Sequence, residues 1–191
     1  MKNELIMKMD MSFSLNFLIY IQNIFFNQNQ KDLRFPYLST RIEFNEDFKL
    51  NYKELWNEIS QGISNNNKND LKIFYEEKDL FYQRLFVVDA DNLKNFNEIC
   101  KTFKVWWDSP AGHFSIERSV DEIGYRLYWD LANLLAQKGI EPQKELNISL
   151  IYDRCLLGQF EVFQNFIILP IRSFLTKKEG EIVYRLQKLF Y

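Results

Sequence analysis

A chain of 191 residues, 47% of them hydrophobic and 26% charged, has the composition of a soluble globular protein, and we expect a single domain over residues 1–191. Its formal net charge of -2 provides no basic field for phosphates, which argues against a nucleic-acid partner. No apolar run approaches the roughly 20 residues that cross a bilayer, so we expect no membrane partner.

The first element, within residues 11–26, fits two kinds of secondary structure. Apolar and polar residues alternate along most of residues 12–21, as they do in a strand with one buried face. Leu18, Ile21 and Ile24 also follow a 3.6-residue period, so a helix competes with the strand. We expect a strand here and leave the helix open. A second strand is predicted for residues 37–45.

Four helices are predicted from apolar stripes that follow capping residues. Three of them begin with a capping box, in which a Glu lies three positions after the N-cap, and the second helix begins with Asp91 as its cap. The boxes are Asn51–Glu54, Ser119–Glu122 and Thr176–Glu179. The predicted helices cover residues 52–64, 92–103, 120–138 and 177–190, with Gly139 at the C-terminal cap of the third.

The segments between these helices are predicted to be pairs of strands. They cover residues 71–76, 84–89, 104–107, 113–117, 146–152 and 159–171. The chain order is then strand, strand, helix, four times over, and short turns join most paired strands, which favours antiparallel pairing. The sequence therefore predicts an α+β fold with a largely antiparallel sheet built from strand-strand-helix units and helices packed on it.

No diagnostic catalytic or cofactor motif occurs in the chain. His113 is the single histidine, and Ser109 lies four residues before it across a turn, without the Gly-x-Ser-x-Gly elbow of a hydrolase. We expect His113 to be dispensable. Cys100 and Cys155 lack the spacing of a zinc site, and they predict reduced thiols in a cytoplasmic protein. We expect no catalytic residue, cofactor or metal.

Two acidic patterns leave an enzymatic alternative open. Asp89 and Asp91 form a DxD pattern after an apolar segment, and Glu76 with Lys78 has the ExK spacing found in nuclease sites. A metal-dependent phosphoryl-transfer or nuclease-like enzyme could use Glu76, Asp89 and Asp91. A phosphate-binding loop and a second nuclease motif are both missing, which favours charged turns instead. A subunit of a larger assembly is the other alternative.

Aromatic residues make up 17% of the chain and suggest a recognition surface. Trp106 and Trp107 are neighbours in a predicted strand, so one of them is expected to face outward, and the pattern leaves open which one. Tyr125, Tyr128 and Trp129 lie partly off the leucine stripe of their helix. Exposed Trp and Tyr among acidic residues are typical of interface hot spots, although a thick aromatic core explains the composition equally well.

The small size, the single acidic domain, the lack of a catalytic motif and the Asn-, Lys-, Phe- and Ile-rich composition give the chain a general likeness to one class of proteins. It resembles the bacterial immunity proteins of contact-dependent inhibition and other polymorphic toxin systems. The resemblance implies a non-catalytic protein that binds and neutralises a cognate toxin domain, such as a basic nuclease, helped by electrostatic steering. The candidate partner-binding residues are Glu76, Glu77, Asp79, Asp89, Asp91, Trp106, Trp107 and Asp108.

Overall fold

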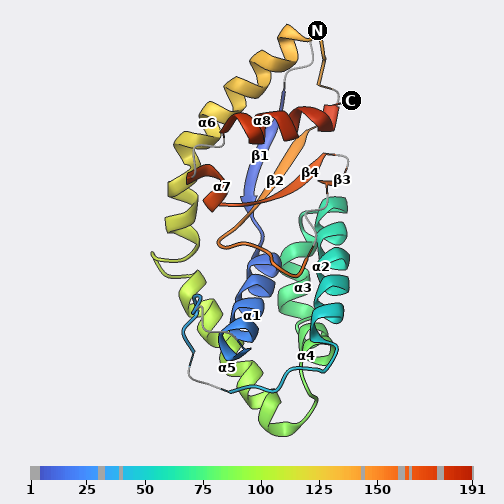
Figure 1. Cartoon of the computed structure of the whole chain (residues 1–191), viewed down its shortest axis with the longest axis vertical. Coiled ribbons are helices and arrows are strands. Elements are labelled where there is room, and N and C mark those ends of the chain that lie inside the picture. The colour runs from blue at the N-terminus through green and yellow to red at the C-terminus, as the bar shows by residue number, and fades with distance from the viewer. Residues whose placement is uncertain are drawn as a thin grey trace.

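Helices make up most of the molecule, and three parallel strands form a small sheet at one end of it (Figure 1). The computed structural model describes residues 5–29, 33–38, 41–142, 145–158, 162–163, 165–175 and 179–190. The helices among them are α1 (Phe13–Asn29), α2 (Phe48–Asn65), α3 (Asn69–Glu76), α4 (Asp79–Leu85), α5 (Ala90–Trp107), α6 (His113–Gln137), α7 (Arg172–Leu175), α8 (Glu179–Gln187) and the short 3₁₀ helix η1 (Lys188–Phe190). The strands are β1 (Met7–Met11), β2 (Leu146–Ile151), β3 (Val162–Phe163) and β4 (Phe166–Pro170).

The sheet has the order β1-β2-β4-β3, which places β1 at one edge. β1 runs parallel to β2 with Met9 opposite Ile148, and β2 runs parallel to β4 with Ile148 opposite Ile167. β3 adds only a two-residue antiparallel pairing to β4. Helices α1 to α6 lie between β1 and β2 in the chain, so a long helical crossover joins two neighbouring parallel strands. The protein is therefore a mostly helical α/β protein.

This architecture shows that the α+β prediction of a largely antiparallel sheet was wrong. Residues 71–76, 104–107 and 113–117 were expected to be strands and are helical, and residues 84–89 hold the end of α4 and one isolated bridge, from Phe86. Short apolar runs do not distinguish a buried strand from one or two turns of a buried helix. Only the flanking residues reveal the helical spacing.

Several local predictions are confirmed. Residues 52–64, 92–103 and 120–138 lie almost entirely within α2, α5 and α6, and the described part of residues 177–190 forms α8 and η1. Gly139 follows α6 with φ of 66°, the left-handed conformation expected after a helix. β2 matches the predicted strand 146–152, and β4 lies within the predicted strand 159–171, of which residues 159–161 and 164 lie outside the described residues.

Two of the predicted helix starts are wrong because the helices begin earlier. Asn51 lies inside α2, where its side-chain amide donates a hydrogen bond to the carbonyl of Arg84. α6 begins at His113, and the hydroxyl of Ser119 donates to the carbonyl of Ser115 within the helix instead of capping it. Thr176, the expected cap of the last helix, lies outside the described residues.

Two further predictions concern strands near the N-terminus. Residues 37–45 contain a single bridge, between Phe44 and Phe86, in place of the expected strand, and residues 39–40 lie outside the described part. β1, by contrast, was not predicted. Its five residues combine three methionines with Lys8 and Asp10, and methionine gives a weaker strand signal than valine or isoleucine.

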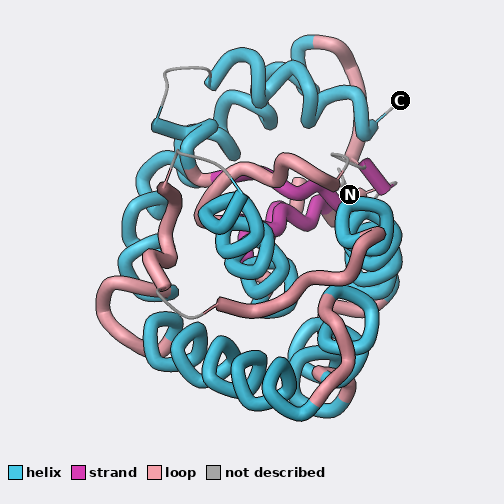
Figure 2. Tube along the Cα trace, turned by 60° about the horizontal axis from the view of Figure 1, so that its bottom comes forward, coloured by secondary structure: helices cyan, strands magenta, loops and turns pink. Residues whose placement is uncertain are grey.

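The ambiguous segment 11–26 forms the central helix α1. Nearly every side chain from Phe13 to Phe26 is buried, and Figure 2 shows a central helix enclosed by other helices and loops. A helix buried on all sides has apolar residues all round, so its sequence lacks the one-sided 3.6-residue stripe of a surface helix. The alternation from Ser12 to Asn16 then resembles a strand although the chain is helical.

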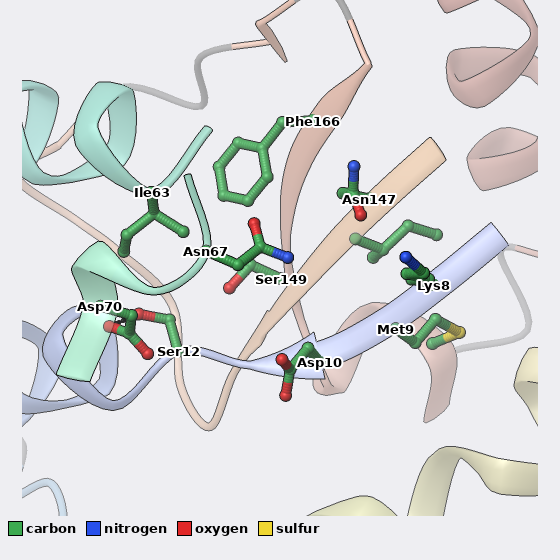
Figure 3. A pocket seen from close by; sticks show the side chains of 11 residues that line it. Lys8, Met9, Asp10, Ser12, Ile63, Asn67, Asp70, Asn147, Ser149 and Phe166 are labelled. Atoms are coloured by element: carbon green, nitrogen blue, oxygen red, sulfur yellow. Dashed lines mark hydrogen bonds between the residues drawn. The ribbon is translucent and has the colours of Figure 1, made fainter. Parts of the chain in front are cut away.

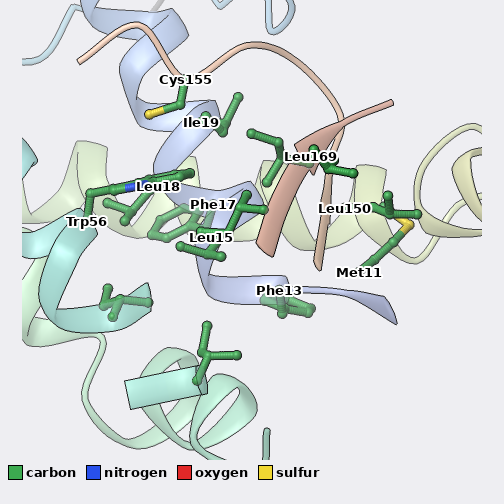
Figure 4. Close-up of a cluster of buried hydrophobic side chains, with 14 of the residues drawn as sticks. Met11, Phe13, Leu15, Phe17, Leu18, Ile19, Trp56, Leu150, Cys155 and Leu169 are labelled. Atoms are coloured by element: carbon green, nitrogen blue, oxygen red, sulfur yellow. The ribbon is translucent and has the colours of Figure 1, made fainter. Parts of the chain in front are cut away.

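The aromatic residues fill the core around α1. The ring of Phe17 lies 5.0 Å from those of Phe74 and Phe103 and 5.2 Å from that of Phe81, measured between ring centroids. Figure 4 shows the same helix extending its apolar side chains toward Trp56 in one direction and Leu169 of β4 in another. Most of the aromatic content therefore belongs to a thick aromatic core, the simpler of the two explanations raised by the composition.

Buried amide side chains of α1 attach the chain segment that follows β2. Asn16 donates to the carbonyl of Leu150, and its oxygen accepts a hydrogen bond of 2.8 Å from the Tyr152 amide. One turn and a half later, Gln22 donates to the carbonyl of Arg154 and accepts from the Leu156 amide at 2.6 Å. These amides satisfy backbone groups that would otherwise be buried without partners.

Replacing Asn16 with alanine should therefore destabilise the fold strongly. The change leaves the Tyr152 amide and the Leu150 carbonyl without their side-chain partner in the protein interior, and each such loss costs about 1–3 kcal/mol. We expect the free energy of unfolding, measured by urea denaturation, to fall by about 2–4 kcal/mol. Asn133→Ala on the exposed side of α6 is the matched control and should change it by less than about 0.5 kcal/mol. Equal losses in the two variants would contradict this account.

Candidate functional site

One face of the sheet carries polar side chains where a buried sheet is usually apolar. Lys8 lies opposite Asn147 and Asp10 lies opposite Ser149 in the register of β1 and β2. Paired residues of neighbouring strands share a face of the sheet, so these four side chains lie on the same side. Ser12, which follows β1, continues the row.

A cavity of about 270 Å³ lies over this polar face, and we call it the sheet pocket. It is closed on one side by the connection from α2 to α3. Figure 3 shows the side chains of Asn67, Ser149 and Phe166 gathered in this space, with Ser12 and Asp70 at one end of it. The lining residues are Lys8, Met9, Asp10, Ser12, Ile63, Asn67, Asp70, Asn147, Ile148, Ser149 and Phe166.

Asp70, in the first turn of α3, caps the start of α1 from outside that helix. Its carboxylate accepts hydrogen bonds from the Ser12 hydroxyl at 2.7 Å, the Phe13 amide at 2.7 Å and the Ser14 amide at 2.9 Å. A negative charge at a helix N-terminus is stabilised by the unpaired amides and the helix dipole. Burial raises the pKa of Asp70, and the hydrogen bonds from Ser12, Ser14 and Phe13 act in the opposite direction.

Two polar atoms of the sheet pocket are buried without a hydrogen-bond partner among the described residues. They are the hydroxyl oxygen of Ser149, a residue that is only 4% exposed, and the side-chain oxygen of Asn147. Burying a polar group without a partner costs stability, so most such groups in proteins are paired. Both residues line a cavity that has further polar side chains in its wall, which makes the sheet pocket the candidate ligand site of this fold.

The acidic residues predicted to bind a partner lie in three separate places. Glu76, Glu77 and Asp79 are exposed where α3 meets α4, and Glu77 forms an ion pair of 3.2 Å with Lys72. Asp89 and Asp91 lie at the start of α5, and Asp108 lies at its end. The 18 residues of α5 span about 27 Å, so these carboxylates do not share one compact patch.

The cap of α5 is Asp89, not Asp91 as the sequence suggested. The Asp89 carboxylate accepts a hydrogen bond of 2.8 Å from the Asn92 amide, and Asp91 lies exposed in the first turn. Glu76 does not join these two residues in a metal-binding group. Within the described ranges no cluster of three or more His, Cys, Asp or Glu residues is placed to hold a metal ion.

The two tryptophans predicted as anchor candidates pack inward. They lie in the last turn of α5, so the expectation that neighbours on a strand face opposite sides does not apply. Trp107 is 6% exposed. Trp106 is half-buried, with its ring 4.9 Å from those of Phe35 and Tyr152. Neither tryptophan protrudes as a free anchor.

The turn between α5 and α6 depends on a glycine. A Cβ on Gly112 would overlap the backbone of Trp106 and Trp107, so no other residue fits this close approach. His113 follows directly, half-buried, with its ring 5.3 Å from that of Trp107. It lines a second cavity, of about 370 Å³, between β1 and α6.

Sequence reasoning missed the sheet pocket. Its polar residues come from three distant parts of the chain, around residues 10, 70 and 149. The parallel pairing of β1 with β2 joins the first and the third, and the hydrogen bonds of Asp70 to the start of α1 add the second. One local signal exists in the segment "LNISLI", where Asn147 and Ser149 alternate with apolar residues in a strand that is buried on both faces. Polar residues at such positions need partners or a ligand.

Comparison with known proteins adds no relative. The chain matches no protein family, no curated protein and no solved structure. Among the described residues, no helix combines the length and the hydrophobicity that a membrane span requires.

The two cysteines are free and shielded, and we expect their thiols to react slowly in the folded protein. Burial raises the pKa of Cys100 to about 12 and that of Cys155 to about 11. At pH 8 only about one Cys100 thiol in ten thousand is then the reactive thiolate. Alkylation by iodoacetamide, followed by mass spectrometry, should be slow for both residues in buffer and fast in urea. Rapid labelling of either cysteine in the native protein would contradict the burial.

Proposed function

We propose that this chain is a non-catalytic binding protein, and specifically an immunity protein that binds and neutralises a cognate toxin domain. The observation that carries the proposal is a set of exposed aromatic side chains on one side of α6. Phe114, Tyr125 and Trp129 are 60%, 66% and 48% exposed. Large aromatic side chains grouped on a surface are a common feature of protein interfaces.

These residues lie on the outer side of α6, and we call them the α6 stripe. Their spacing is helical, and the stripe lies opposite the buried residues of the same helix, which are Ile116, Val120, Leu127, Leu131 and Leu135. The rings of Tyr125 and Trp129 lie 6.1 Å apart, and that of Tyr128 lies 5.5 Å from Trp129. Tyr125, Tyr128 and Trp129 therefore form one aromatic group on this helix of 25 residues, and Phe114 lies about three turns before it on the same side.

Charged side chains surround the aromatic rings as they do at the rim of an interface. Glu117, Asp121 and Asp130 are exposed on the same helix. The carboxylate of Asp121 forms an ion pair with the guanidinium of Arg118, with 3.6 Å between oxygen and nitrogen. Such exposed charges contribute little affinity, but they influence the association rate and the choice of partner. The stripe replaces Trp106 and Trp107 as the proposed anchor.

Removing an aromatic anchor should weaken toxin binding mainly by speeding dissociation. We expect Trp129→Ala to cost about 2 kcal/mol of binding free energy to the cognate toxin domain, measured by surface plasmon resonance. Co-expressed with that domain in bacteria, the variant should protect growth less well than the wild type. His113→Ala, on the buried side of the same helix, is the control and should bind like the wild type. A folded Trp129→Ala protein with unchanged dissociation would contradict the proposal.

The acidic turn between α3 and α4 should affect the rate of association with the toxin domain and not the rate of dissociation. Glu76, Glu77 and Asp79 are exposed, so their charges act over about a Debye length and are screened by salt. Replacing them with Gln, Gln and Asn should slow association with a basic toxin domain and flatten its dependence on salt. The same measurement in 50 and 300 mM salt tests this. An association rate that is unaffected at both salt concentrations would remove this turn from the interface.

A further inference from the structure

We propose that the sheet pocket binds a small, uncharged, polyhydroxylated molecule of monosaccharide size. The site lies on the polar face of the sheet and is built from residues that the α6 stripe does not contain, so the inference does not rest on the proposed immunity function.

The two unpaired polar atoms lie beneath the pocket and are closed to solvent, so a ligand reaches them only when the side chains that cover them turn aside. Ser149 and Asn147 are two positions apart on β2 and so point to the same side, about 7 Å from each other. The Ser149 hydroxyl can donate and accept, whereas the Asn147 oxygen only accepts. A molecule with several hydroxyl groups supplies donors and acceptors at this spacing, and a purely accepting ligand does not.

The charges around the pocket exclude anions. The carboxylates of Asp10 and Asp70 line it, and Lys8, the lysine at its edge, forms an ion pair with Glu145. In many α/β proteins a phosphate binds at the N-terminus of a helix that follows a strand. Here the Asp70 carboxylate already accepts hydrogen bonds from the first amides of α1, so the position that would attract a phosphate carries a negative charge.

The shape and the apolar wall of the pocket set the size of the ligand. A volume of about 270 Å³ lies just below the roughly 300–1,000 Å³ of cavities that hold drug-sized molecules. The apolar residues of the lining are Met9, Ile63, Ile148 and Phe166, and Figure 3 shows the ring of Phe166 facing the same space as Asn67 and Ser149. A sugar ring presents hydroxyl groups at its edge and an apolar C–H face, which matches this division of the pocket.

The test measures the binding of D-glucose, D-galactose and D-ribose to the full chain. Saturation-transfer NMR detects the bound sugar, and changes in the amide chemical shifts of the protein locate it. At least one sugar should bind and shift the amide signals of Asn67, Ser149 and Phe166. Glucose 6-phosphate should bind more weakly than glucose, because the carboxylates repel the phosphate. Binding by none of the three sugars at 50 mM, or tighter binding of the phosphorylated sugar, would overturn the proposal.

Ser149→Ala separates a ligand-binding role from a structural one. The substitution removes a buried hydroxyl without a partner, so the melting temperature should stay the same or rise, while sugar affinity should fall about tenfold. Asn147→Ala gives a second, independent readout with the same expected loss of affinity. Ser115→Ala on the exposed surface of α6 is the matched control and should leave both quantities unchanged. Unchanged sugar affinity in both pocket variants would contradict the assignment.

Discussion

The structure depends on the hydrogen bonds that the buried helix α1 makes through its polar side chains. A helix enclosed on all sides contributes apolar packing in every direction, but packing alone does not determine which segments surround it. Asn16 and Gln22 bind backbone groups of residues 150–157, and Asn23 binds the Asp153 carboxylate at 3.0 Å. Because an unpaired amide in the interior is costly, these contacts favour one arrangement of sheet and helices over other apolar packings.

Asp70 connects the polar contacts of helix α1 to the proposed ligand site. The same carboxylate that caps α1 also forms one end of the sheet pocket, so the fold and the chemistry of the pocket share a residue. The cap places a negative charge where a helix N-terminus would otherwise attract an anion. The preference of the pocket for uncharged ligands therefore follows from the way in which the central helix is stabilised.

The sequence predicted several elements that have a strong local signal, but it misassigned short apolar runs and missed what distant contacts determine. The stripe of α2, the Gly139 cap and the buried strand β2 each have a pattern within a few neighbouring residues, and the structure contains all three. α1 is surrounded by the rest of the fold, so its apolar residues lie on every side of the helix. Its sequence therefore shows no single apolar stripe, and part of it resembles a strand. The parallel pairing of β1 with β2 joins residues about 140 positions apart, and the polar face of the pocket depends on that pairing.

The tryptophans show which inferences about side-chain exposure the sequence supports. The expectation for Trp106 and Trp107 depended on a strand that is in fact a helix, and both side chains pack inward. The position of Trp129 relative to the leucines of α6 depended only on a helical period that the structure confirms, and this side chain is 48% exposed. An aromatic residue off the buried stripe of a reliably predicted helix is therefore a better candidate for recognition than a more conspicuous aromatic pair in an ambiguous segment. The proposed binding surface on α6 follows from that periodicity, whereas the sheet pocket required the folded chain.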